Sequence, residues 1–157
     1  MIKICDLDLG PCTGCNYECF DQYSHCPIQD DTATVYEKIL ESDLVIIAVP
    51  TYSSAPPASY FAWRERSQGI FTHNDQYENF EKVVKGYIVF GNEEAGGREV
   101  VNFLQQDSEK PLEYLMLQSH EYDQSSIEGN LVEITEVREK LLTFTKELID
   151  KTGLDKS

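Results

Sequence analysis

A continuous apolar run, Leu44 to Val49, is the sequence feature that most restricts the fold of this chain. The run reads Leu-Val-Ile-Ile-Ala-Val, is largely β-branched, and ends at Pro50. An apolar run without polar alternation is typical of a strand that is covered on both faces, as in a parallel sheet. Two further apolar strands are predicted, from Val83 to Phe90 and from Leu112 to Ser119.

Segments with helical spacing separate these strands. A first helix is predicted to begin after a capping residue at Asp30, Asp31 or Thr32. Three more are predicted from Ala58 to Arg66, from Gly97 to Gln106 and from Ile134 to Lys151. Residues 2–9 alternate apolar and polar side chains and predict a first strand, whereas the polar residues 70–82 predict an ordinary connection. This alternation of strands and helices predicts an α/β fold with three layers, helix on sheet on helix, around a four-stranded parallel sheet.

The length of the chain predicts how many domains it has, and its net charge disfavours certain classes of partner. The 157 residues predict a single domain over 1–157, with a cysteine loop at 10–30. The 28 acidic residues against 13 Lys and Arg give a net charge of −15, which disfavours nucleic acid and anionic membrane surfaces as partners. The first residues leave no room for the apolar core of a signal peptide, so a cytoplasmic location is predicted.

Four cysteines stand close together, at positions 12, 15, 19 and 26. Cytoplasmic thiols stay reduced, so this spacing does not indicate a disulfide framework. Four thiolates can converge on zinc or on an iron-sulfur cluster, although the gaps match neither ferredoxin pattern. Two interpretations stay open, a metal site formed by these cysteines and a loop that merely contains small, half-buried side chains.

Two further loops follow the carboxyl ends of predicted strands, where ligands bind in open parallel sheets. One loop is Pro50-Thr-Tyr-Ser-Ser-Ala-Pro-Pro57, which offers hydroxyls and an aromatic ring for a flat ligand with polar edges. The other is Gly91-Asn-Glu-Glu-Ala-Gly-Gly97, whose helix-opening glycines offer free N–H groups. An ordinary strand-to-helix turn is the alternative interpretation of each loop.

These motifs occur together in one order. The cysteine loop with Asp30-Asp31, then Asp-Leu-Val-Ile-Ile-Ala-Val-Pro-Thr-Tyr, Phe-Ala-Trp-Arg-Glu-Arg and Gly-Asn-Glu-Glu-Ala-Gly-Gly resemble the NADPH-dependent FMN reductase and iron-sulfur flavoprotein branch of the flavodoxin-like superfamily. The resemblance implies an oxidoreductase or electron-transfer protein that uses FMN and NAD(P)H, with a homo-oligomer and a 4Fe-4S cluster as further expectations. It implies ring contacts from Pro50, Thr51, Tyr52, Ser53, Gly91, Asn92, Gly96 and Gly97, and cluster ligands from Cys12, Cys15, Cys19 and Cys26.

The start of the chain departs from that family pattern. The family begins with a strand and a loop that holds the FMN phosphate, and this chain begins at the second strand of the pattern, so an N-terminally truncated sheet is predicted. We therefore expect weak FMN binding unless another segment supplies the phosphate anchor, and a natural protein longer than this start implies. Candidate cations are Arg64, Arg66 and Arg98. No side chain is predicted to be a catalytic acid or base.

Two other functions compete with the flavin enzyme. One is a flavodoxin-like module that binds partners without FMN, and the other is a metal-binding protein whose α/β body presents the four cysteines. Visible absorption separates the three functions, because bound flavin is yellow, an iron-sulfur cluster is brown and zinc is colourless.

Overall fold

The computed structural model describes residues 1–15, 18–21, 26–69, 71, 74–124 and 130–153. The chain forms two compact units, one from residues 1–43 and 58–83 and the other from residues 44–57 and 84–157. Each unit therefore combines two separate stretches of sequence. We call them the cysteine unit and the sheet unit.

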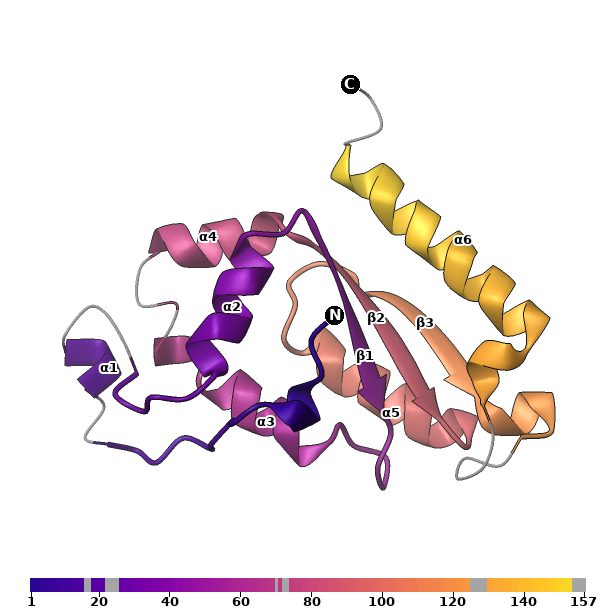
Figure 1. Cartoon of the computed structure of the whole chain (residues 1–157), viewed down its shortest axis with the longest axis horizontal. Coiled ribbons are helices and arrows are strands. Elements are labelled where there is room, and N and C mark those ends of the chain that lie inside the picture. The colour runs from indigo at the N-terminus through magenta and orange to yellow at the C-terminus, as the bar shows by residue number, and fades with distance from the viewer. Residues whose placement is uncertain (16–17, 22–25, 70, 72–73, 125–129, 154–157) are drawn as a thin grey trace. The chain divides into compact units, whose positions relative to one another are not determined.

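The sheet unit is built on three parallel strands. They are β1 (Leu44–Pro50), β2 (Val84–Gly91) and β3 (Glu113–Gln118), hydrogen-bonded in the order β1-β2-β3 (Figure 1). The register pairs Leu44 with Val84 and Gly86 with Glu113. All three strands run in the same direction, so their carboxyl ends meet at one edge of the sheet.

The helices of the sheet unit follow the strands. They are α5 (Glu94–Gln105), η3 (Ser119–Tyr122), η4 (Leu131–Glu133) and α6 (Thr135–Thr152). The apolar stripe of α6 buries Val137, Phe144 and Leu148, and the helix ends at Gly153, whose positive φ of 74° suits a residue without a Cβ.

Helices α5 and α6 pack on opposite faces of this sheet (Figure 1). A Cβ added at Gly86 of β2 would meet Leu148 of α6, and a Cβ added at Gly97 of α5 would meet Met116 of β3. Gly86 is in register with Glu113, three residues before Met116, and the alternation of side chains along a strand puts these two contacts on different faces. The predicted three-layer arrangement is confirmed within this unit.

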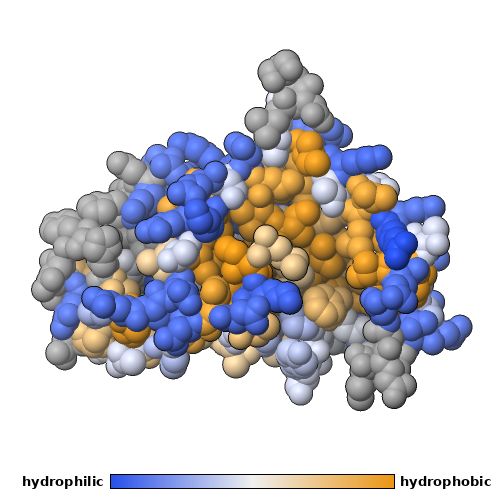
Figure 2. Space-filling model, in the orientation of Figure 1, coloured by the Kyte–Doolittle hydropathy of each residue, from blue (hydrophilic) through white to orange (hydrophobic). Residues whose placement is uncertain are grey.

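The face of the sheet that packs against α6 keeps apolar side chains on its surface. Ile46 of β1 and Phe90 of β2 are each 37% exposed, and Figure 2 shows an apolar surface over these strands. Burying such side chains favours folding by about 25 cal/mol per Å². The sheet unit therefore leaves apolar area on this face unburied.

The cysteine unit is helical. Its elements are η1 (Ile4–Asp6), α1 (Glu18–Asp21), α2 (Thr32–Leu40), α3 (Ala58–Glu65), η2 (Ser67–Gly69) and α4 (Asn74–Lys82). An aromatic cluster forms its core: Tyr36 stacks on Trp63 with ring centroids 5.1 Å apart and meets Phe71 edge-on at 5.1 Å, while Phe71 also contacts Phe80 at 4.8 Å. Such pairs add about 0.5–1.5 kcal/mol each beyond the area that they bury.

Two predictions about this unit are wrong. Residues 2–9 form no strand; a 3₁₀ turn occupies Ile4–Asp6, and the described sheet has three strands rather than four. An alternating segment becomes a strand only when another strand pairs with its backbone, and none does so here. The segment predicted as a connection contains helix α4, because Tyr77 and Phe80 pack against Phe71.

The remaining predicted strands and helices are confirmed, with shifts of up to three residues at their ends. The structure therefore has the α/β architecture with a parallel sheet that the flavodoxin-like resemblance implies. Within the residues that the structure describes, no helix combines the length and the apolar character needed to cross a membrane.

Candidate functional sites

The loop after β1 folds into a tight two-residue turn. Tyr52 and Ala55 exchange both of their backbone hydrogen bonds, each 2.9 Å long, and Ser53 and Ser54 between them have φ angles of 49° and 61°. Two consecutive left-handed residues define a type I′ turn, a conformation that serine adopts at some cost. The turn leaves the ring of Tyr52 62% exposed.

Thr51 joins this turn to the neighbouring strand. Its N–H donates to the carbonyl of Phe90 at 2.8 Å, which continues the ladder between β1 and β2. A Cβ added at Gly91 would lie 3.0 Å from Thr51 Cβ, and one added at Gly96 would lie 3.2 Å from Thr51 Cγ2. The structure thus brings together Thr51, Gly91 and Gly96, three of the predicted ring-binding residues. The Thr51 hydroxyl is buried and has no hydrogen-bond partner among the described residues.

Asn92 connects the ends of β2 and β3. Its side-chain oxygen accepts a hydrogen bond from the Ser119 hydroxyl at 2.9 Å. Its backbone oxygen lies 2.7 Å from Nδ1 of His120 and accepts the His120 N–H at 3.4 Å. A carbonyl can only accept, so Nδ1 of His120 donates in this contact.

Gly97 and Gln118 lie close together where α5 packs on β3. A Cβ at Gly97 would lie 2.5 Å from Nε2 of Gln118 and 2.7 Å from Sδ of Met116, so the absent side chain allows α5 to pack closely on β3. Gln118 is fully buried, and neither polar atom of its side chain has a partner in the described part of the chain. A buried amide without a partner costs about 1–3 kcal/mol.

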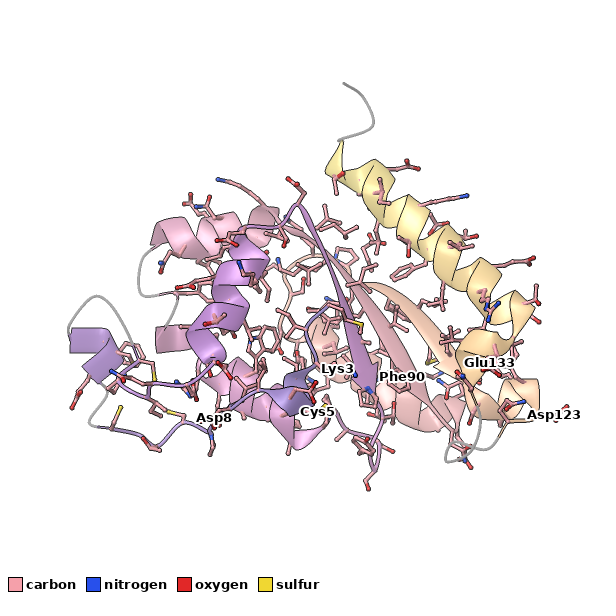
Figure 3. The ribbon with its side chains drawn as sticks, in the orientation of Figure 1. Lys3, Cys5, Asp8, Phe90, Asp123 and Glu133 are labelled. Atoms are coloured by element: carbon pink, nitrogen blue, oxygen red, sulfur yellow. The ribbon has the colours of Figure 1, made fainter. Side chains whose placement is uncertain are left out.

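The carboxyl end of the sheet thus combines a buried hydroxyl, glycines that allow close packing and an exposed aromatic ring. The N–H groups of the first turn of α5 have no partner within the helix. Figure 3 labels Phe90 near the end of β2 and Asp123, which caps η3 beyond β3, and so marks the two sides of this edge. This arrangement can hold a flat ring by stacking and by hydrogen bonds to its polar rim.

The cysteine loop gathers thiols in the other unit. Cys15, Cys19 and Cys26 are half-buried and Cys12 is exposed. A Cβ at Gly69 would lie 3.0 Å from Cβ of Cys26 and 3.4 Å from Cβ of Cys19, so η2 closely approaches both cysteines. Burial raises the pKa of the Cys19 thiol, and the nearby thiols of Cys26, Cys15 and Cys12 add to this effect.

These thiols are suitable metal ligands by their chemistry, but their described positions do not form a complete coordination site. Four sulfur donors in one loop are the ligand set of zinc and of iron-sulfur clusters. Among the residues that the structure describes, no group of three or more His, Cys, Asp or Glu side chains is arranged to hold a metal. Residues 16–17 and 22–25 of this loop lie outside the described residues.

One contact fixes the start of the loop, and the fifth cysteine lies outside it. The N–H of Cys12 donates to the Glu65 carboxylate at 2.6 Å, which attaches the start of the loop to the end of α3. Cys5 belongs to the N-terminal segment at η1, and its thiol contacts the neighbouring Asp6 (Figure 3).

Two of the candidate cations are paired with carboxylates. Arg66 is buried beside Asp30, and Arg98 pairs with Glu94 on the surface of α5. Burial alone would raise the pKa of Asp30, but hydrogen bonds from Arg66, from the Gly10 N–H and from Thr32 outweigh it and lower the pKa to about 2. Neither arginine is therefore poised to hold a phosphate.

Comparison with known proteins identifies the family of this chain. Residues 1–122 match the family described as NADPH-dependent FMN reductase, which is more than half of the chain. The chain belongs to the NADPH-dependent FMN reductase family. In this FMN reductase family member, the matched range contains the cysteine loop, the turn after β1, the glycines around α5 and the strand β3.

Three curated relatives are iron-sulfur flavoproteins. Those of Methanocaldococcus jannaschii and Methanosarcina thermophila are each 32% identical over 98 residues, which cover 62% of this FMN reductase family member and 48% and 49% of the relatives. That of Archaeoglobus fulgidus is 27% identical over 92 residues, or 59% of this chain and 45% of the relative. The chain spans about half the length of these proteins. No solved structure matches it.

Sequence reasoning missed three residues at the carboxyl end of β3, namely Gln118, Ser119 and His120. Their position at the end of a predicted strand was the available signal, because residues there meet the ends of the neighbouring strands. It also missed the pairing of Asp30 with Arg66, for which the sequence carries no local signal.

Proposed function

We propose that this chain binds the flavin ring of FMN at the carboxyl ends of β1 and β2 and relays electrons from NAD(P)H to a second acceptor. The observation that carries the proposal is the convergence of Thr51, Gly91 and Gly96 on one point, with a buried Thr51 hydroxyl that has no partner in the described chain. A polar group that folding leaves buried and unpaired is explained when a ligand pairs with it.

The surrounding residues have distinct roles in this proposal. Tyr52 offers an exposed ring on which the flavin stacks, and the type I′ turn keeps that ring from collapsing onto the strand. The Ser119 hydroxyl donates to the side-chain oxygen of Asn92 and orients that side chain, while His120 contacts the Asn92 backbone carbonyl. Bound FMN supplies the hydride and one-electron chemistry, and the protein supplies position and polarity. We assign no acid or base.

We further propose that Cys12, Cys15, Cys19 and Cys26 hold an iron-sulfur cluster. The clustered thiols support this, as do the names of the three curated relatives. Free thiolates in this number fit a cytoplasmic protein, since reducing conditions keep them available. We also expect the chain to form a homo-oligomer.

Recognition of the FMN phosphate is expected to be weak in the chain as given. Arg66 and Arg98 are both paired with carboxylates, and a net charge of −15 repels a phosphate. Charge-assisted hydrogen bonds contribute about 1.5–3 kcal/mol each, and their absence leaves the ring as the main source of affinity.

Flavin titration tests the ring site. Tyr52→Ala is expected to weaken FMN binding by up to about tenfold, because an aromatic contact contributes about 0.5–1.5 kcal/mol beyond buried area and 1.4 kcal/mol corresponds to tenfold. Tyr114→Ala, which removes another exposed tyrosine of the same unit, is the matched control and should leave affinity unchanged. Equal affinities for both variants would remove Tyr52 from the site.

Two further measurements complete the test. Riboflavin and FMN should bind equally well if this chain holds only the ring, and a clear preference for FMN would show that it also holds the phosphate. The visible spectrum of protein purified without air should show flavin and cluster absorption together. A colourless protein that contains zinc would favour the metal-binding alternative, and one with neither metal nor flavin would favour the FMN-less module.

A further inference from the structure

A buried ion pair closes the cysteine loop at its base. Arg66 follows helix α3, and Asp30 stands four residues after Cys26. The Arg66 and Asp30 side chains are 2% and 4% exposed, which makes them among the most deeply buried charges in the cysteine unit. Charges are almost never buried to this extent unless they are paired, so the position of this pair needs an explanation.

The guanidinium of Arg66 joins the two ends of the loop. Its Nη1 donates to the Gly10 carbonyl at 3.2 Å and to the Asp30 carboxylate, and its Nη2 donates to the Ile28 carbonyl at 3.0 Å. Gly10 precedes the first cysteine of the loop and Ile28 follows the last. One side chain thus fixes both sides of the stretch that carries all four thiols.

Asp30 reinforces the same closure. Its carboxylate accepts the N–H groups of Gly10 and Thr32, each at 3.0 Å. These donors and Arg66 occupy its oxygens, so the negative charge of Asp30 is turned toward backbone N–H groups.

The positive charge of the pair is directed toward the cysteines. Burial opposes the charged form of Arg66, but hydrogen bonds with Asp30 and with the Cys26 thiol outweigh it and raise the pKa of the guanidinium. The Nε of Arg66 is buried and has no hydrogen-bond partner among the residues that the structure describes. A buried cationic N–H without an acceptor is costly, so Nε is left available to a further acceptor.

We propose that Arg66 is a positioning residue of the cysteine site: it locks the two ends of the loop and places a buried positive charge at the base of the stretch that carries the cysteines. This inference rests on the proposed iron-sulfur function. A cluster held by four thiolates is anionic and becomes more so on reduction. A buried cation at the base of the loop would therefore favour the reduced form.

The choice of arginine is part of the inference. Lysine would keep the charge, but its single ammonium cannot span Gly10, Ile28 and Asp30 as the flat guanidinium fork does. Locking the loop and supplying charge are thus separable by substitution. Arg66→Lys keeps the charge and loses the lock, whereas Arg66→Met combined with Asp30→Asn removes both charges without leaving one of them buried alone.

The experiment uses the full chain reconstituted without air with iron and sulfide. Iron and sulfide content, the rate of iron loss to a chelator and the midpoint potential from a redox titration are measured for wild type, for Arg66→Lys and for Arg66→Met/Asp30→Asn. Arg64→Met is the matched control, because Arg64 is exposed on α3 two residues before Arg66. Far-UV circular dichroism reports whether each variant keeps its helices.

Outer-shell partners of metal sites contribute about 10–100-fold in metal affinity, so both Arg66 variants should lose iron about 10–100-fold faster than wild type. The double variant should also have a more negative midpoint potential, whereas Arg66→Lys stays closer to wild type. If the double variant does not fold, Arg66→Lys still decides, since iron loss at the wild-type rate would overturn the lock. Folded variants with the wild-type midpoint potential and the wild-type rate of iron loss would overturn this inference and leave the proposed cluster unaffected. A wild type that takes up no iron would refute the cluster and this inference with it.

Discussion

The packing of α6 on the sheet makes a prediction whose size follows from one contact. A Cβ added at Gly86 would lie 2.2 Å from Cδ1 of Leu148 and 3.2 Å from Cζ of Phe144. Leu148 is 1% exposed, so its side chain has no free space into which to move. Gly86→Ala should cost about 1–3 kcal/mol through overpacking, partly offset by about 0.5–1 kcal/mol because alanine suits a strand better than glycine.

Leu148→Ala removes the obstructing side chain and should by itself cost about 2–5 kcal/mol, because it leaves a cavity. In the double variant the methyl group added at position 86 enters that cavity. We therefore expect the double variant to be less destabilised than the sum of the single variants by at least about 1 kcal/mol.

Urea unfolding followed by circular dichroism measures the four free energies of this cycle. Val137→Ala paired with Gly86→Ala is the control, since Val137 is fully buried on the same helix but lies about 16 Å along its axis from Leu148. The control pair should be additive within about 0.5 kcal/mol. Additivity of the Gly86 and Leu148 substitutions would refute the close approach of α6 to β2.

Two further predictions concern the loops. Because the pKa of Asp30 is lowered from 3.8 to about 2, the unfolded chain binds more protons in this range, and the free energy of unfolding should fall by up to about 2.5 kcal/mol as pH drops from about 4 to about 2. Asp30→Asn should flatten that dependence in pH-dependent urea unfolding, and an unchanged slope in this variant would contradict the assignment. Ser53→Asn with Ser54→Gly suits the type I′ turn and should raise stability by about 1 kcal/mol, and a lower urea midpoint would count against the left-handed φ angles at these two serines.

Local signals in the sequence were sufficient for the elements that pattern alone determines. The apolar run of β1 and the apolar stripe of α6 need no knowledge of their partners, and both elements are found where they were predicted. Residues 2–9 show the opposite case, because alternation becomes a strand only if a neighbouring strand supplies hydrogen bonds. Helix α4 was missed because Tyr77 and Phe80 stand among polar residues, and contacts with Phe71 and Tyr36 make them a packing face.

Some residues of the candidate sites could likewise be predicted from local signals, and others could not. Thr51, Gly91 and Asn92 could be predicted from their positions after apolar strands, and the structure brings Thr51 and Gly91 together. Whether they bind FMN stays a prediction. The Arg66 and Asp30 pair joins residues 36 positions apart, and an arginine on a helix is usually solvated, so nothing local distinguishes it from Arg64.

The interleaving of the two units has a consequence for how this protein can be divided or inherited. The chain passes between the units after residues 43, 57 and 83. A single cut in the chain, or a single recombination breakpoint in its gene, therefore cannot separate the unit that gathers the thiols from the unit that carries the strands. Either unit can be obtained as one continuous piece only together with the short stretch of the other unit that interrupts it.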